Sequence, residues 1–249
     1  FPVLTREINH KTSIRLIEKV QNSQVKGFIF LSTCSSYGIA DGLATEETSL
    51  NPLSLYAETK VKVEKYLMNK SRGLDWVICR LSTAYGSSLR MRFDLTVNDF
   101  AMKAFTKKYL DIFLPHSFRP YIHVFDIARV IVKIVEKFDE IKNNVFNIGF
   151  EGENYRKIQI AEIIRKLIPE TEIEIVKSGR DLRDYQVDFS KLKKLLNIKN
   201  IYTVKNGAVE VLKLLRDRII KNPYESRYYN TMPNLEKEEL ATEILTKND

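Results

Sequence analysis

Tyr56 and Lys60 stand four residues apart, a spacing that places both side chains on one face of an α-helix. There the ammonium can favour the phenolate, which makes the tyrosine a general acid/base able to move a hydroxyl proton while hydride leaves the adjacent carbon. Tyr66 and Lys70 repeat the spacing, but Tyr66 lies among apolar residues in mid-helix, where packing is the expected role. Because Tyr56 opens its helix just after the turn at 51–52, we predict that Tyr56 is the reactive tyrosine.

A cluster of hydroxyl side chains follows the apolar run at residues 27–31 and includes Ser32, Thr33 and Ser35. A short apolar run of β-prone residues predicts a buried strand. Parallel α/β sheets bind ligands at the carboxyl ends of their strands. These hydroxyls are therefore expected beside a ligand, the alternative being that they only cap a loop.

The elements that must hold these side chains form a strand, helix, strand pattern, in which both strands are nearly all apolar. This pattern predicts an α/β fold with a parallel sheet covered on both faces. A helix at 12–20 precedes the first strand, Ser54 can cap a helix over 54–70, and residues 76–81 form the next strand. The stretch 35–52 between them is polar and rich in turn residues.

Beyond residue 88 the pattern changes. We divide the chain into a first part at 1–88, a smaller lobe at 89–221 whose segment near 121–149 returns to the first part, and a polar tail at 222–249. Helices are expected at 97–107, 126–136, 158–167, 187–196 and 208–220, and strands at 121–124, 145–148 and 172–176.

The composition narrows the class of protein. The chain of 249 residues is 44% hydrophobic and has no apolar run long enough to span a membrane, so a cytoplasmic protein is expected. Its net charge of +8 is spread along amphipathic helices, which argues against nucleic acid as a partner. Two cysteines, Cys34 and Cys79, are too few for a disulfide framework or a structural zinc site, and no metal is expected.

In combination these residues resemble the extended short-chain dehydrogenase/reductases, the NAD-dependent nucleotide-sugar epimerase/dehydratase family. The resemblance rests on Asn9, residues 28–33 followed by Tyr37-Gly38, the Tyr56/Lys60 pair, and residues 80–86, 119–124, 146–149 and 188–191. It implies a Rossmann-like doubly wound parallel sheet, incomplete at its N-terminus, with a smaller α/β substrate-binding lobe.

The resemblance also implies roles for individual residues. Thr33 would polarise the substrate oxygen, Tyr56 would be the acid/base, and Lys60 would lower its pKa and hold the nicotinamide ribose. The implied cofactor contacts are Asn9, Ser32, Tyr56, Lys60 and Thr83. The implied substrate contacts are Thr33, Thr83, Asn98, Asp99, Arg119 and Arg183, with Arg180 in the same region as Arg183. An arginine is well suited to a diphosphate, which it can bind in bidentate fashion.

Two features depart from the family pattern. The glycine-rich turn Gly-x-x-Gly-x-x-Gly, which brings a pyrophosphate to a helix N-terminus, does not occur in this sequence. Because Phe1 aligns well inside the nucleotide-binding domain, we expect about three further βα units to precede it in a complete protein. In addition, the 4,6-dehydratases carry an Asp-Glu pair directly after the threonine, where this sequence has Cys34 and Ser35.

The leading hypothesis is epimerisation of a nucleotide-linked sugar through a transient keto intermediate, with NAD as cofactor and NADP left open. The alternatives are a nucleotide-sugar 4-ketoreductase or dehydrogenase, a 4,6-dehydratase, and a non-catalytic truncated remnant. The resemblance further implies a homodimer formed through the helices near 12–20 and 54–70.

Overall fold

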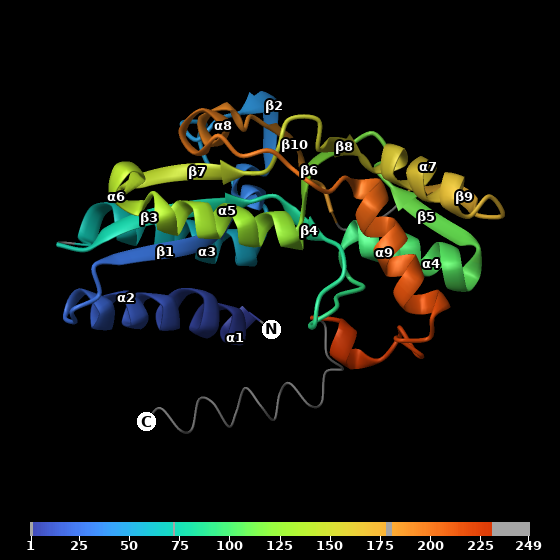
Figure 1. The fold of residues 1–249 in the computed structure, drawn as a ribbon, viewed down its shortest axis with the longest axis horizontal. Helices are drawn as coiled ribbons and strands as arrows, with labels where there is room; N and C mark the ends of the chain where they lie inside the picture. The colour runs from blue at the N-terminus through green and yellow to red at the C-terminus, as the bar shows by residue number, and fades with distance from the viewer. Residues whose placement is uncertain (1, 72, 178–180, 231–249) are drawn as a thin grey trace.

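A three-stranded parallel sheet lies between two layers of helices (Figure 1). The computed structural model describes residues 2–71, 73–177 and 181–230. Its sheet contains β1 (Gly27–Thr33), β3 (Asp75–Leu81) and β7 (Asn144–Ile148), with β3 in the middle. Gly27 pairs with Asp75 at one end of β1 and Thr33 with Leu81 at the other, which confirms the predicted parallel sheet.

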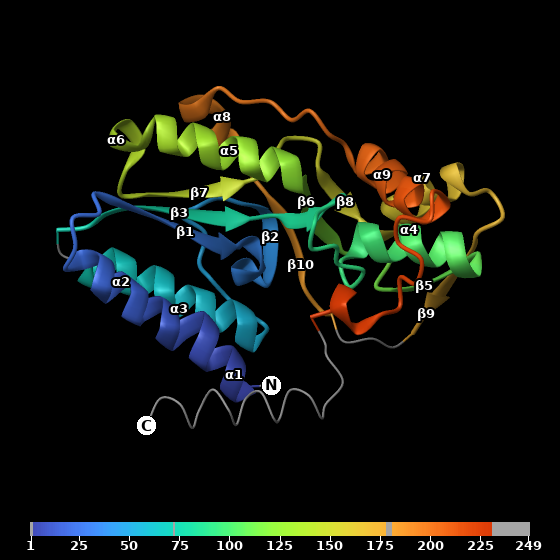
Figure 2. The same cartoon turned by 60° about the horizontal axis from the view of Figure 1, so that its bottom comes forward.

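Helices cover this sheet on two sides, as Figure 2 shows. One layer consists of α1 (Pro2–Arg6), the π-helix η1 (Glu7–Thr12), α2 (Ser13–Gln21) and α3 (Leu55–Lys70). The other contains α5 (Val124–Glu136), α6 (Phe138–Ile141) and α8 (Ser190–Leu196). Successive strand residues point to opposite faces, so Ile78 packs with the first layer while Val77 and Cys79 pack with the second. Burial on both faces explains why β3 is apolar apart from Asp75 at its start and Arg80, whose charge is paired with Glu64.

The start of α3 is fixed beside the carboxyl end of β1. Ser54 is extended and its hydroxyl accepts a hydrogen bond from Ala57 N at 3.2 Å, which confirms the predicted cap. The 3-10 helix η2 (Cys34–Tyr37) follows β1 directly and contacts α3. The end of the strand and the first turn of the helix therefore meet.

Elements outside this sheet and its helix layers form a second core, which already includes β4 (Thr83–Tyr85), within the predicted first part at 1–88. It contains β4, β6 (Phe118–His123) and β8 (Asn154–Arg156) in one sheet, β5 (Tyr109–Phe113) paired with β9 (Glu172–Val176), and the helices α4 (Thr96–Lys107), α7 (Lys157–Leu167), α9 (Val204–Arg216) and η3 (Ser226–Tyr228). Buried side chains from α4, α7 and α9, among them Met102, Ile160 and Val211, pack together in this core. Among the described residues no helix is both long and apolar enough to cross a membrane.

Two local predictions were wrong. The polar stretch at 35–52 contains β2 (Ile39–Ala44), and the helix expected from residue 187 begins only at Ser190, after β10 (Asp184–Val187). β2 and β10 pair in parallel, and Tyr185 and Val187 are buried against Cys34 and Tyr37. The two strands stabilise each other through contacts between distant segments, which local periodicity does not record. Residues 231–249 of the predicted tail, and Arg180, lie outside the described residues.

Candidate active site

Thr33 and Tyr56 come together where β1 ends and α3 begins. Thr33 is 7% exposed, and its hydroxyl accepts a hydrogen bond from Ser35 N at 3.1 Å. The Thr33 hydroxyl lies close enough to the Tyr56 phenol to lower its pKa. Tyr56 itself is 44% exposed, so a ligand can reach its phenol. The structure therefore brings together the two hydroxyls that the sequence predicts to act on one oxygen.

The charges around Tyr56 favour the phenolate, but the phenol stays protonated before the reaction. Although part of the ring is exposed, burial raises the pKa of the phenol above its ordinary value. Three neighbours oppose this rise, in decreasing order Arg92, Thr33 and Arg183. The phenol is therefore protonated at neutral pH. The charges of Arg92 and Arg183 would stabilise the phenolate if the proton left.

Lys60 makes different contacts from those predicted. Its Nζ donates to Leu31 O of β1 at 2.9 Å and lies 4.8 Å from the centroid of the Phe30 ring. Burial lowers the pKa of the ammonium, and the Glu64 carboxylate opposes that effect. The cations that act on the Tyr56 phenol are thus the two arginines named above, because the ammonium has turned toward the backbone of β1. The contact of Lys60 with a nicotinamide ribose stays a prediction.

Ser32 donates a hydrogen bond to Glu64, a residue that the sequence analysis missed. Glu64 is fully buried, and Arg80 binds its Oε2 through Nη2 at 2.8 Å and through Nε at 3.1 Å. Arg80 also donates to the Tyr37 hydroxyl at 3.0 Å. The sequence does contain a signal for this pair: a carboxylate four residues after Lys60, on the face of α3 that is expected to be buried, and an arginine within an otherwise apolar strand. This network joins α3 to β1 and β3 directly beneath the site.

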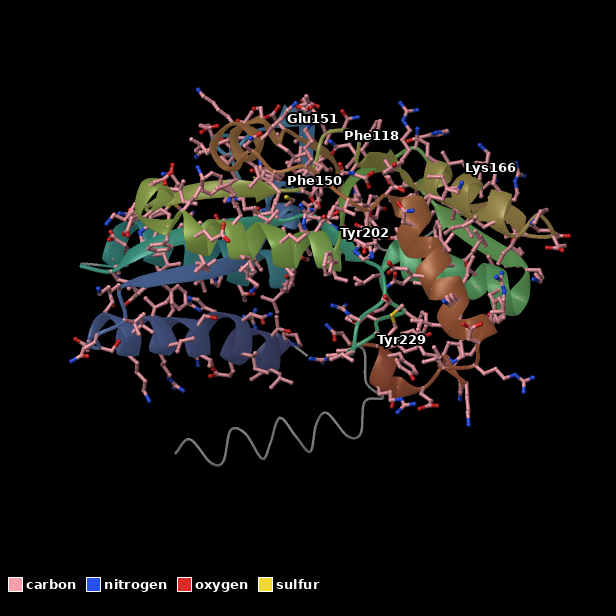
Figure 3. All side chains as sticks on the ribbon, in the orientation of Figure 1. Phe118, Phe150, Glu151, Lys166, Tyr202 and Tyr229 are labelled. Carbon is pink, nitrogen blue, oxygen red and sulfur yellow. The ribbon has the colours of Figure 1, made fainter. Side chains whose placement is uncertain are left out.

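Arg119, Arg183 and Asp181 form a second cluster, which we call the arginine site. Arg119, next to the Phe118 labelled in Figure 3, is 3% exposed and donates from Nη2 to Asp181 Oδ1 at 2.9 Å. Arg183 donates to both oxygens of Asp181, from Nε at 2.8 Å and from Nη2 at 3.0 Å. Burial alone would raise the pKa of Asp181, but the hydrogen bonds from Arg183 and the charge of Arg119 hold it well below its usual range. The carboxylate is therefore ionised.

Ser35 connects the arginine site to Thr33. Its hydroxyl accepts a hydrogen bond from Arg183 Nη1 at 2.6 Å, while its backbone nitrogen donates to the Thr33 hydroxyl. The neighbouring Cys34 is fully buried, its thiol donates to Arg80 O at 3.1 Å, and burial raises its pKa. The thiol is therefore a packing group and stays protonated at neutral pH.

The remaining predicted residues have structural contacts of their own. Asn98 is 2% exposed, and its amide holds the loop before α4 by accepting from Gly86 N at 3.1 Å and donating to Arg92 O at 3.0 Å. Asp99 pairs with Lys103 at 3.2 Å. Because these side chains already bind protein groups, they have fewer hydrogen-bonding positions free for a ligand. A contact of Asn98 or Asp99 with a diphosphate therefore stays a prediction.

Asn9 precedes Thr33 and Tyr56 in the sequence, and Thr83 follows them. Thr83 opens β4, is partly exposed, and pairs with Tyr121 of β6. Asn9 lies within the π-helix η1, a rare geometry that is frequent at functional sites, and its carbonyl accepts from the Ser13 hydroxyl at 3.1 Å. Within the described part of the chain, no group of His, Cys, Asp and Glu side chains could hold a metal ion.

Comparison with known proteins shows what this arrangement is similar to. The model of a family described as "NAD dependent epimerase/dehydratase family" matches residues 1–149. A Bacillus subtilis protein named "Uncharacterized UDP-glucose epimerase YtcB" is 29% identical over 206 residues, which cover 81% of this chain and 64% of the relative. This chain thus spans less than two thirds of the length of that relative.

Two solved structures share the fold at 25% identity. One is a UDP-glucuronic acid 4-epimerase from Bacillus cereus in complex with NAD, with a TM-score of 0.75 over 85% of this chain and 68% of the other. The second is a dTDP-glucose 4,6-dehydratase from Bacillus anthracis in complex with NAD, with the same TM-score and the same coverage. An epimerase and a dehydratase are thus equally similar overall, so the choice between them depends on the site.

Proposed function

We infer, since this chain belongs to the NAD dependent epimerase/dehydratase family, that the complete protein modifies a nucleotide-linked sugar with NAD as cofactor and most simply epimerises it. One observation carries the proposal: Ser35 bonds to both Arg183 and Thr33, so that a site for phosphate and a site for a reacting hydroxyl are neighbours. A nucleotide sugar has both groups in one molecule. The names of the related epimerases give UDP-sugars as their substrates, which supports the proposal.

The residues of this chain fit the nicotinamide half of the cofactor. The Tyr56 phenol is accessible beside Thr33, and we propose Asn9, Lys60 and Thr83 as further contacts. NAD, when bound, supplies a hydride acceptor. Ser32 is the weaker candidate because its hydroxyl is already donated to Glu64.

In the proposed reaction Tyr56 takes the proton from a sugar hydroxyl, and Thr33 holds the same oxygen by a hydrogen bond. The charges of Arg92 and Arg183 offset the developing phenolate. Return of the proton from Tyr56 completes the cycle, so the phenol is both base and acid. Net oxidation or reduction of the sugar would use the same residues and remains the second candidate.

The proposal also extends to the assembly and its location. The outer side of the α1, η1 and α2 layer exposes Val3, Ile8 and Leu16, and the end of α3 exposes Met68. We propose that these apolar side chains pair between two copies of the protein in the cytoplasm, because burying them in a dimer would remove apolar area from water.

The choice of epimerase over dehydratase predicts a product of unchanged mass. A 4,6-dehydration needs an acid and a base beside the keto sugar, and the positions after Thr33 carry a buried thiol and an alcohol bonded to Arg183. We expect the complete protein, incubated with NAD and a panel of UDP- and dTDP-hexoses, to yield an epimer by NMR. Mass spectrometry should find no product lighter by one water.

Each other outcome identifies a different function. Accumulation of a 4-keto-6-deoxy sugar would establish the dehydratase, and stoichiometric NADH formation would establish the dehydrogenase. Binding of UDP without turnover of any sugar would identify a non-catalytic protein.

The arginine site predicts a defect in binding. Arg119→Ala should raise the KM for the nucleotide sugar more than it lowers kcat, because a contact to a diphosphate acts equally on ground and transition states. Lys166→Ala, a change of the same charge on an exposed residue of α7, is the control and should leave both constants unchanged. A loss confined to kcat would contradict this role of Arg119.

A further inference from the structure

The arginine site contains its own anion. Resting on the proposed function, we propose that the Asp181 carboxylate takes the place of a ligand phosphate in the ligand-free protein, and that a diphosphate binds by displacing it from Arg119 and Arg183. Asp181 thereby sets the affinity of the site and its preference for strongly charged anions.

The geometry around Asp181 is that of a bound oxyanion. Three hydrogen bonds are its principal contacts: Oδ1 accepts from Arg119 Nη2 and Arg183 Nε, and Oδ2 accepts from Arg183 Nη2, all between 2.8 and 3.0 Å. Guanidinium groups bind phosphate through the same parallel N–H···O bonds. Two guanidiniums that converge on one carboxylate are therefore already arranged for a phosphate.

The arginines are held more firmly than the carboxylate. Arg119 is 3% exposed and lies over the Tyr185 ring, 5.2 Å from its centroid. The Arg183 side chain is 31% exposed, but it is anchored separately by its bond to Ser35. The Asp181 side chain is 37% exposed, and within the described residues its hydrogen bonds all come from the two arginines. Of the three partners, the carboxylate is thus the one that can leave while the cations keep their positions.

The charge balance favours replacement by a diphosphate. Two guanidiniums and one carboxylate leave the cluster with a net positive charge, and Lys157 acts on the same group of charges. Arg119 also has a buried Nε with no hydrogen-bond partner among the described residues. A diphosphate carries more charge and more acceptor oxygens than one carboxylate, so it satisfies the site better, whereas a weakly charged anion cannot compete with Asp181.

The test is the affinity of Asp181→Asn for UDP and for inorganic pyrophosphate, measured by calorimetry on the complete protein. The amide removes the competing charge, so both dissociation constants should fall by about tenfold or more. Asp184→Asn is the matched control: it lies three residues away, changes the net charge equally, and Asp184 accepts from Phe118 N instead of from the arginines. It should bind both ligands like the wild type.

The same change should destabilise the ligand-free protein, because two arginines then face each other without a counterion. Added pyrophosphate should restore the melting temperature of Asp181→Asn and raise it by more degrees than in the wild type. Should the variant fail to fold alone, recovery of a cooperative melt with pyrophosphate supports the proposal, and failure to fold even then contradicts it.

The outcomes separate this proposal from the proposed function. If the wild type binds UDP and Asp181→Asn binds it equally well or more weakly, the displacement alone is overturned, because Asp181 would then not compete with the ligand. Absence of UDP and pyrophosphate binding from every variant would overturn both the displacement and the phosphate role of the arginine site.

Discussion

Replacing Tyr56 with phenylalanine should lower kcat of the complete protein by about 10²- to 10⁴-fold, the range that positioned general acid/base groups contribute. The change removes the hydroxyl on which Thr33 and Arg92 act, so the proton of the sugar hydroxyl loses its proposed acceptor. Because the residue is 44% exposed and loses one atom, the free energy of unfolding should stay the same. Steady-state kinetics and a denaturant melt measure the two effects.

Tyr66→Phe is the matched control on the same helix. Its hydroxyl donates to Glu18 of α2 at 3.1 Å, away from Thr33, and should be dispensable for turnover. The assignment of the reactive tyrosine would be wrong if Tyr66→Phe lost activity and Tyr56→Phe kept it.

Arg80→Met should lower the free energy of unfolding by about 3–5 kcal/mol, the cost of leaving a buried charge without its partner. Arg80 is 3% exposed, Glu64 is fully buried, and the two are joined by two hydrogen bonds to one oxygen. Without the guanidinium, Glu64 keeps the hydrogen bond from Ser32 and the attraction of the Lys60 ammonium, which together replace only part of the lost ion pair. Urea unfolding followed by circular dichroism measures the loss.

The double variant Glu64→Leu/Arg80→Met tests the cause. Removing both charges should cost less than Arg80→Met alone, because no charge is then left buried. Lys193→Met, which breaks the exposed pair with Glu151, should change stability by less than about 1 kcal/mol. Equal losses in the double variant and in Arg80→Met would mean that packing of the arginine stem, and not its charge, stabilises the fold.

The sequence by itself determined most of the frame and supplied the prediction of the chemistry. The apolar runs of β1 and β3 predict strands buried on both faces, and the structure confirms them, since side chains on both faces of the sheet pack against helices. The same holds for α3, whose Ser54 cap is a local signal. Tyr56 was separable from Tyr66 because one opens the helix and the other lies within it. Each of these inferences uses neighbours in the chain, and short-range patterns record them.

Only the tertiary structure decided which side chains meet across the chain. β2 pairs with β10, Lys60 donates to Leu31 O, and Glu64 binds Arg80. The periodicity of the sequence does not indicate these contacts. Asp181 is the clearest case: in sequence it is one acid among basic residues, and in the fold it lies between Arg119 and Arg183. The partner of a charge is set by the segments that packing brings together, because Coulomb and hydrogen-bond energies depend on distance in space and not on separation along the chain.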